Sequence, residues 1–204
     1  MTYFDERAKD WDSDPTKVER ARVVANAIRE ALPHKTGMTA LEIGCGTGLL
    51  SFALQPDFAS ITLADTSEGM LTVLTDKIRE ADVKNMHPQH LDLTSDPLPA
   101  TRFDIIYSLM TMHHIPDTDF VLKQCFNLIK PGGTLFIIDL EREDGSFHGH
   151  AAMDVHTGFE QTTLQIQVES AGFKQVQFSN VYAVKKMAAG VTKSFPLFML
   201  TAQK

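Results

Sequence analysis

The chain has 204 residues, of which 43% are hydrophobic and 22% are charged, a composition that suits one globular domain with a sizeable core. A formal net charge of -7 excludes a broad basic field and disfavours nucleic-acid binding, and no apolar run is long enough to span a membrane. Without a signal-peptide pattern, and with Cys45 and Cys125 in no metal or redox spacing, we expect a cytoplasmic protein whose partner is a small molecule, not nucleic acid or a membrane; the oligomeric state is not indicated.

The first 13 residues are polar with aromatic interruptions. Asp14 and Pro15 then form a helix N-cap and first helical residue, and apolar residues recur at helical spacing as far as Leu32, which predicts an amphipathic helix over about 15–32. Phe4 and Trp11 leave two interpretations of this N-terminal arm open: it folds over a ligand, or it only docks on the core.

The stretch from Leu41 to Gly48 predicts a strand over about 38–43, a glycine turn, and a short helix that ends at Pro56. Such a turn lets backbone approach a ligand, and the helix start offers unpaired N–H groups. A dinucleotide-binding turn requires a small residue where Leu49 stands, and the Glu42 carboxylate would repel a pyrophosphate. The pattern therefore favours a cationic ligand without phosphate.

A second strand over 61–64 ends at Asp65, which lies 21 positions after Gly44. A carboxylate at this place can accept hydrogen bonds from ribose hydroxyls, although it could also cap a helix. Thr66 or Ser67 can cap the next helix, whose buried stripe begins at Met70.

Strands and helices continue to alternate along the rest of the chain, which predicts a doubly wound parallel sheet. The turn residues Lys130–Gly133 are expected to separate a helix from a strand, and Lys185, Lys186 and Lys193 to lie in a solvated turn. The expected elements are strands over 85–93, 103–108, 134–139, 174–184 and 195–203, and helices over 117–130 and 160–170.

The glycine turn, Glu42-x-Gly44-x-Gly46-x-Gly48, resembles the E-x-G-x-G-x-G motif of class I S-adenosylmethionine-dependent methyltransferases. The segments 103–114 and 128–135 also resemble that family, so the likeness covers nearly the whole chain. It implies an α/β, doubly wound, seven-stranded Rossmann-like sheet, mostly parallel with one antiparallel C-terminal strand. The Asn/Asp-Pro-Pro-Tyr/Phe motif of amino-adenine enzymes and the Pro-Cys of cytosine-C5 enzymes are absent after the fourth strand.

The resemblance implies a single methyltransferase domain over 1–204 that uses S-adenosyl-L-methionine. Its parts are an N-terminal arm and lid helix (1–32), a cofactor-binding core (38–139), a substrate-side insertion (140–160) and a C-terminal helix with a β-hairpin (161–204). The acceptor is an unidentified small molecule.

The resemblance also implies the cofactor-binding residues. Asp65 would bind the ribose and Asp92 the adenine amino group, although Asp92 could instead cap a surface turn. Met70 could equally be core packing, and Cys45 a small packing residue. The implied set is Trp11, Glu42, Gly44, Cys45, Gly46, Thr47, Gly48, Asp65, Thr66, Met70, Asp92, Leu93 and Ser108.

Methyl transfer from a sulfonium is an in-line displacement in which the protein mainly aligns and dries the reactants. A general base is needed only when the acceptor keeps its proton at neutral pH, and His114, His113, His148 and His156 are the candidates. Each could instead be a satisfied or surface histidine. His148, His150 and His156 could bind a metal with Asp139 or Glu141, but their spacing matches no zinc signature, so no metal is expected.

Two other functions stay open. A non-catalytic S-adenosylmethionine-binding protein or partner subunit would keep the glycines and Asp65 but lack a substrate-sized opening. A nicotinamide-dependent oxidoreductase is disfavoured by the glycine spacing and by Glu42.

Overall fold

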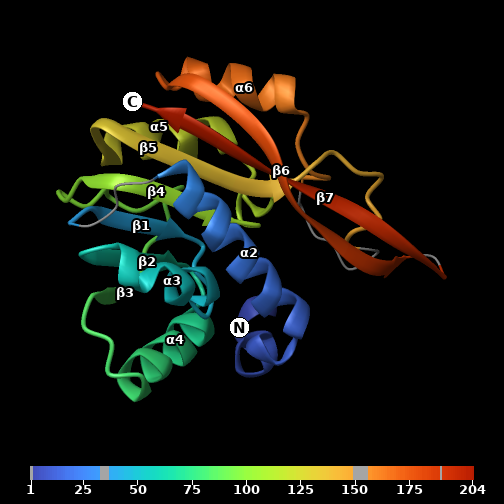
Figure 1. The fold of residues 1–204 in the computed structure, drawn as a ribbon, viewed down its shortest axis with the longest axis horizontal. Coiled ribbons are helices and arrows are strands. Elements are labelled where there is room, and N and C mark those ends of the chain that lie inside the picture. The colour runs from blue at the N-terminus through green and yellow to red at the C-terminus, as the bar shows by residue number, and fades with distance from the viewer. Residues whose placement is uncertain (1, 33–36, 149–155, 189) are drawn as a thin grey trace.

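The computed structural model describes residues 2–32, 37–148, 156–188 and 190–204, and its seven strands form one sheet in the order β3-β2-β1-β4-β5-β7-β6 (Figure 1). Strand β7 runs antiparallel to both of its neighbours, and the other pairings are parallel. The predicted fold class is therefore confirmed. The strands are β1 Thr39–Ile43, β2 Ser60–Asp65, β3 Met86–His90, β4 Phe103–Leu109, β5 Ile129–Leu140, β6 Lys174–Ala188 and β7 Val191–Gln203.

Helices cover both faces of the sheet. One core cluster joins α2, α3 and α4 to one face, and a second joins α5 and α6 to the other. Strand residues alternate between the clusters, as Ala40 and Leu41 do, because successive side chains of a strand point to opposite faces. The helices are α1 Tyr3–Arg7, α2 Pro15–Ala31, α3 Leu49–Leu54, α4 Glu68–Glu80, α5 Thr118–Leu128 and α6 Gln161–Ser170, with 3₁₀ turns η1 Ala8–Ser13, η2 Gln55–Asp57 and η3 Met112–His114.

Two helix starts have the caps that the sequence predicts. The Asp14 side chain accepts from the Thr16 N–H at 2.9 Å, with Pro15 as the first residue of α2. The Ser67 hydroxyl accepts from the Met70 N–H at 3.2 Å at the start of α4. These local hydrogen bonds satisfy donors that a helix leaves free, and they fix where each helix leaves the sheet.

The strand order reverses between β1 and β4, which lie side by side at the centre of the sheet. After β1 the chain proceeds to β2 and β3 on one side, and after β4 it proceeds to β5 on the other. The loops that follow β1 and β4 therefore diverge, and they open a crevice at the carboxyl ends of these strands. The glycine turn and the segment 110–116 are the two loops at this point.

Three sequence-based boundaries were wrong. Helix α5 ends at Leu128 and β5 begins at Ile129, so Lys130–Gly133 belongs to the strand and not to a turn. The register passes from the pair Phe103–Ile129 to the pair Ile105–Thr134, so the additional residues of β5 bulge out of the ladder. Strand β3 stops at His90, short of the predicted 93, because its pairing with β2 ends where Asp65 faces His90.

The C-terminal hairpin is longer than predicted, and Figure 1 shows it projecting beyond the other strands. Lys185 pairs with Ser194 and Lys186 with Lys193, so these residues lie in strands rather than in the predicted solvated turn. The two strands of the hairpin continue to pair with each other through their main chains beyond the residues that pair with β5. None of the described helices combines the length and the apolar character needed to cross a membrane.

Gly48 and Gly132 give a matched pair for testing the packing beneath the glycine turn. Both have a φ of +78°, but a Cβ at Gly48 would lie 2.6 Å from Leu74 Cδ1, whereas a Cβ at Gly132 meets no atom within 4 Å. We expect Gly132→Ala to cost about 1–2 kcal/mol through the left-handed backbone alone. Gly48→Ala should cost about 1–3 kcal/mol more, because Leu74 is fully buried and cannot easily move. Urea unfolding measures both losses, and equal losses would contradict the packing argument.

Candidate active site

A cavity of about 360 Å³ lies at the carboxyl ends of the central strands. Its wall combines residues 42–47 at the end of β1, Asp65 and Thr66 after β2, residues 91–94 after β3, and residues 109–111 and 114–116 after β4. Phe4 and Trp11 of the N-terminal arm also line it. The volume lies in the range of pockets that hold small molecules, and the place is where doubly wound sheets bind them.

The three glycines of the turn have positive φ values, and at each of them the missing side chain has a different consequence. A Cβ at Gly44 would lie 2.2 Å from Thr111 Cγ2, so this glycine lets the turn contact the loop after β4. Gly48 instead packs on Leu74 beneath the turn. At Gly46 the nearest atom is Met70 Sδ at 3.8 Å, so the absent side chain leaves space within the cavity.

The Asp65 carboxylate connects the turn to the start of α4. One oxygen accepts from the Gly46 N–H at 2.7 Å, and the other accepts from the Ser67 N–H at 2.9 Å. Asp65 also lines the cavity. Since a carboxylate has about four acceptor sites, it retains capacity for donors from a ligand.

Asp92 lies on the cavity wall and accepts from both the N–H and the hydroxyl of Thr94, at 2.8 and 2.6 Å. These bonds are those of the turn-capping alternative. A further side-chain hydrogen bond, from Ser95, also stabilises the Asp92 carboxylate.

Glu42 is 3% exposed and lies in the cavity wall at the end of β1. Its carboxyl accepts a short hydrogen bond from Ser51, whose hydroxyl is 2.6 Å from the Tyr107 hydroxyl. Burial raises the pKa of Glu42 to about 8, although the Ser51 hydrogen bond opposes this rise. The sequence argument treated Glu42 as a charged carboxylate, whereas the surroundings without a ligand keep it mostly neutral at pH 7.

Two aspartates fasten the N-terminal arm over the cavity. The Asp5 carboxylate accepts from the Ser67 hydroxyl at 2.6 Å and from the Gly69 N–H at 3.0 Å, at the start of α4. These donors hold the pKa of Asp5 well below its usual range. Asp12 accepts from the Thr47 hydroxyl at 2.5 Å.

The second Asp12 oxygen pairs with Lys77 Nζ at 2.5 Å, and Lys77 also donates to the Thr47 carbonyl at 2.7 Å. The Thr47 hydroxyl is therefore bonded to the arm. The arm docks on the core through its aspartates and places Phe4 and Trp11 in the cavity wall, and its role as a cover for a ligand stays a prediction.

Sequence reasoning missed two basic residues of α2, Lys17 and Arg20, that line the cavity. Lys17 Nζ lies 3.4 Å from the centroid of the Trp11 ring. Arg20 Nε is buried and has no hydrogen-bond partner among the described residues, and burial lowers the Arg20 pKa. The signal available in the sequence was helical spacing. Lys17 lies four positions before the buried Ala21 and Arg20 four positions before the buried Val24, so both lie on the inward side of α2.

Met110, directly after β4, was not among the predicted cofactor residues. It has a φ of +54°, which is uncommon for a residue other than glycine, and it lines the cavity. Its N–H donates to the Ile138 carbonyl at 2.8 Å, which holds this backbone in place. Strained residues often gather at functional sites, and no sequence signal marked this one.

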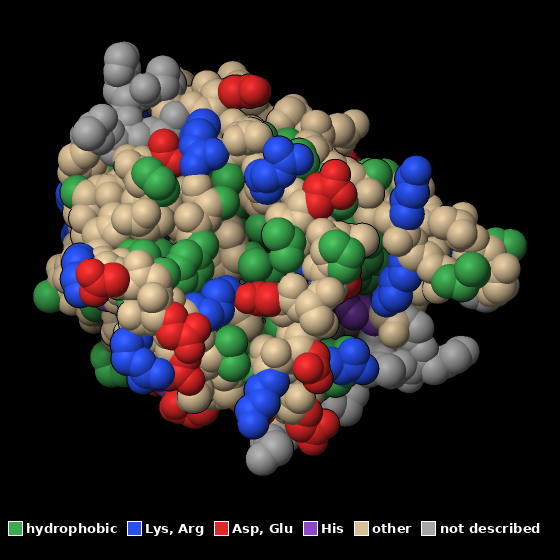
Figure 2. Space-filling view, turned by 60° about the horizontal axis from the view of Figure 1, so that its bottom comes forward, with side chains coloured by type: hydrophobic (Ala, Val, Ile, Leu, Met, Phe, Trp, Pro, Cys, Tyr) green, Lys and Arg blue, Asp and Glu red, His purple; other side chains and the backbone are tan. Residues whose placement is uncertain are grey.

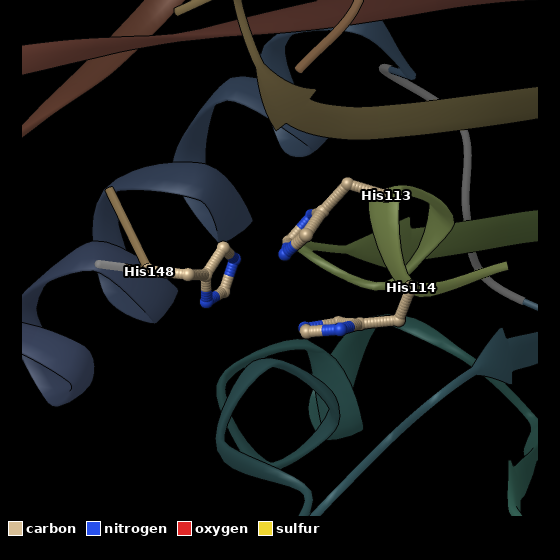
Figure 3. A group of neighbouring side chains, drawn as sticks. All are labelled: His113, His114 and His148. Carbon is tan, nitrogen blue, oxygen red and sulfur yellow. The ribbon is translucent and has the colours of Figure 1, made fainter. Parts of the chain in front are cut away.

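The structure separates the four candidate histidines into a group of three and one apart. His114 lines the cavity, and burial together with the nearby His113 and His148 lowers its pKa to about 3. His113 and His148 lie next to it, with ring centroids 4.1 and 5.2 Å from that of His114 (Figure 3). The ring of His156 instead makes a 2.9 Å hydrogen bond to the Ile115 carbonyl, so it fixes the loop after β4.

His113 has a buried carboxylate behind it. Its ring Nδ1 is 2.5 Å from Asp139 Oδ1, and its backbone N–H donates to Asp139 Oδ2 at 3.2 Å. A carboxylate accepts, so the Nδ1 donates, and in the neutral ring the lone pair is then on the Nε2. That Nε2 is buried and has no partner among the described residues. His150, considered with this group from the sequence, lies outside the described residues.

Most of the predicted cofactor residues share one cavity. All of them line it except Gly48, which packs on Leu74, and Ser108, which is buried in β4. Their roles toward a cofactor stay predictions. On the face shown in Figure 2, acidic and basic side chains are interspersed, so this face has no extended basic surface.

The raised pKa of Glu42 predicts a pH dependence of stability. Between its ordinary value of 4.5 and about 8, the folded protein holds a proton that the unfolded chain releases, so the unfolding free energy falls as pH rises through this range. The slope from this group reaches about 1.4 kcal/mol per pH unit. We expect Glu42→Gln, which stays neutral, to remove that slope in urea unfolding of the ligand-free protein from pH 5 to 8. Glu68→Gln, at an exposed residue, is the control and should retain it; a Glu42→Gln slope equal to that of the parent chain would contradict the assignment.

Comparisons with known proteins support this geometry. Residues 40–133 match the family model described as a methyltransferase domain. An uncharacterized methyltransferase of Schizosaccharomyces pombe is 32% identical over 173 residues, which cover 77% of this chain and 59% of that protein. A ubiquinone biosynthesis O-methyltransferase of Coxiella burnetii is 34% identical over 146 residues, which cover 70% and 62%. The match therefore spans less than two thirds of either relative.

Among solved structures, phosphoethanolamine N-methyltransferase 2 of Haemonchus contortus, in complex with S-adenosyl-L-methionine, superposes with a TM-score of 0.75. The superposition covers 100% of this chain and 60% of that chain at 15% identity, which shows a common fold alone. With the domain match over 40–133, the glycine turn and the observed sheet order, the chain is similar to class I S-adenosylmethionine-dependent methyltransferases.

Proposed function

We propose that the chain transfers the methyl group of S-adenosyl-L-methionine to a small-molecule acceptor. One observation carries this proposal: a single cavity at the strand-order reversal brings together the glycine turn, Asp65 and Asp92. Those residues come from the ends of three different strands, and each had been assigned to the same nucleoside cofactor from sequence. The match to a methyltransferase domain and the names of the relatives support the same activity.

The residues of the cavity fit the chemistry of this cofactor. The open space at Gly46 admits a bulky group close to backbone, and Asp65 offers acceptors for ribose hydroxyls. Asp92 can accept from the adenine amino group. Glu42 can become charged beside a cationic ligand, because an opposite charge favours the ionised carboxyl.

The amino-acid end of the cofactor also carries a carboxylate, and we propose Arg20 as its partner. Arg20 lines the cavity and has a buried Nε without a partner among the described residues. A guanidinium is suited to a carboxylate because its N–H groups match the two oxygens. Lys17, also in the cavity wall, adds positive charge on the same helix.

When bound, the cofactor supplies a methyl group on a positively charged sulfur. The chain aligns the acceptor and excludes water. The aromatic rings of Phe4 and Trp11 contribute to excluding water, because they form part of the cavity wall. His114 lies in that wall and has a lowered pKa, so at pH 7 it is neutral and can accept a hydrogen bond from the acceptor.

The acceptor side is proposed to consist of the loop after β4 and residues 140–160, within one methyltransferase domain that spans 1–204. Residues 141–143 and 157–159 lie against each other, because Arg142 N–H donates to the Phe159 carbonyl and Glu143 N–H to the Thr157 carbonyl. His156 N–H donates to the His113 carbonyl at 2.8 Å, which connects this segment to the loop after β4. The O-methyltransferase name of the Coxiella relative makes small molecules with a hydroxyl group the first acceptors to test.

Binding and turnover test the function separately. We expect S-adenosyl-L-methionine and S-adenosylhomocysteine to raise the melting temperature of the protein, and NAD and NADP to leave it unchanged. Incubation with S-adenosyl-L-methionine and a panel of hydroxyl-bearing acceptors should release S-adenosylhomocysteine, measured by mass spectrometry. Binding without release across the panel would favour the non-catalytic alternative, and stabilisation by NAD would contradict the cofactor.

Asp65→Ala tests the ribose contact. Removing a charged acceptor from a ligand should weaken S-adenosylhomocysteine binding by about 10- to 100-fold, since such hydrogen bonds contribute about 1.5–3 kcal/mol. The control is Asp104→Ala. Asp104 lies at the amino ends of the strands, away from the cavity, where it accepts from the Thr39 N–H at 2.8 Å and pairs with Lys130. We expect that variant to lose stability and to retain the dissociation constant measured by calorimetry. An unchanged dissociation constant for Asp65→Ala would exclude the ribose role.

A further inference from the structure

Three histidines from two distant segments meet beside the cavity. His113 and His114 lie in η3, after β4, and His148 comes from the segment that follows β5. One ligand nitrogen from each ring lies within 4.8 Å of those of the other two. Figure 3 shows the three rings turned toward a common centre.

Two of these rings have nitrogens that nothing in the described part of the chain satisfies. The Nε2 atoms of His113 and His148 are buried and have no hydrogen-bond partner. A buried polar atom without a partner costs free energy, so two of them side by side require an explanation. A ligand at the common centre would provide it.

From this geometry we propose that His113, His114 and His148 bind one divalent transition-metal ion of the Zn²⁺ class. Imidazole nitrogens are typical ligands for such ions, and three histidines leave a fourth position open in a tetrahedral site. Zinc–nitrogen bonds of about 2.0–2.1 Å place tetrahedral ligand nitrogens about 3.3 Å apart. The side chains would therefore need to close in slightly from their present separation.

Asp139 completes the arrangement expected around a metal-bound histidine. Its fully buried carboxylate accepts from His113 Nδ1 at 2.5 Å, which orients the ring and directs Nε2 toward the centre. Carboxylates commonly hold metal ligands in this way.

The surroundings hold charges of both signs. The Asp139 carboxylate favours a cation, whereas the positive charge of nearby Lys186 opposes it and limits the affinity. His114 lines the cavity, so it would place the ion at the cavity wall. A neutral imidazole has one lone pair, so a metal-bound His114 would no longer accept a hydrogen bond from the methyl acceptor. The site differs from the group considered from sequence alone, since His156 is bonded to Ile115 and takes no part.

Metal titration of the chelator-treated full chain tests the site without reference to activity. We expect ZnCl₂ to bind in calorimetry with one ion per chain, and CoCl₂ to give the visible absorption of a four-coordinate ion. His148→Ala should abolish this strong binding, and Asp139→Asn should weaken it by about 10- to 100-fold. His87→Ala, at an exposed histidine of β3, is the matched control and should bind as the parent chain does.

Circular dichroism melting checks that each variant is folded, and His148→Ala keeps the test decisive if Asp139→Asn does not fold. No binding to the parent chain, or equal binding to His148→Ala, would overturn the metal site and leave the rings as an unmetallated group. S-adenosylhomocysteine titration of the same preparations reports separately on the proposed methyltransferase function, so either proposal can fail alone.

Discussion

The site depends on one hydrogen bond between the ends of adjacent strands. The Gly46 N–H donates to the Asp65 carboxylate at 2.7 Å, and so joins the turn after β1 to the end of β2. The same carboxylate accepts from Ser67 at the start of α4, so turn, strand and helix are fixed by a single side chain. Because this side chain also lies in the cavity wall, the group that shapes the turn is the one that a nucleoside would contact.

Buried polar groups surround the cavity on two sides. On one side Glu42, Ser51 and Tyr107 form a chain of hydrogen bonds between β1, α3 and β4. On the other, Asp139 of β5 holds His113. Buried groups of this kind cost free energy unless they are satisfied, and of these groups His113 Nε2 is the one left without a partner among the described residues.

The fold alone does not determine the chemistry, because the same sheet serves proteins with different substrates. In this chain the cofactor side consists of strand ends, whose positions the sheet fixes. The acceptor side consists of the loop after β4 and the segment after β5, which touch through the bond from His156 N–H to the His113 carbonyl. Differences between relatives in substrate are therefore expected in these loops, where length and sequence can vary without disturbing the sheet.

Local patterns in the sequence determined the alternating elements, the caps at Asp14 and Ser67, and the glycine turn, because each depends on residues a few positions apart. Through the resemblance of those patterns to a known family, they also implied a set of cofactor residues, most of which line the cavity. The long C-terminal hairpin and the bulge at Lys130–Gly133 were not predictable, since pairing between strands decides them.

Only the tertiary structure decided which distant side chains meet. His148 lies beside His113 and His114, more than thirty positions away in the sequence, and Asp139 of β5 contacts His113 of η3. Lys17 and Arg20 line the cavity because α2 packs on one face of the sheet. Such contacts depend on strand order, register and helix placement together, and residues within a few positions of one another carry no record of them.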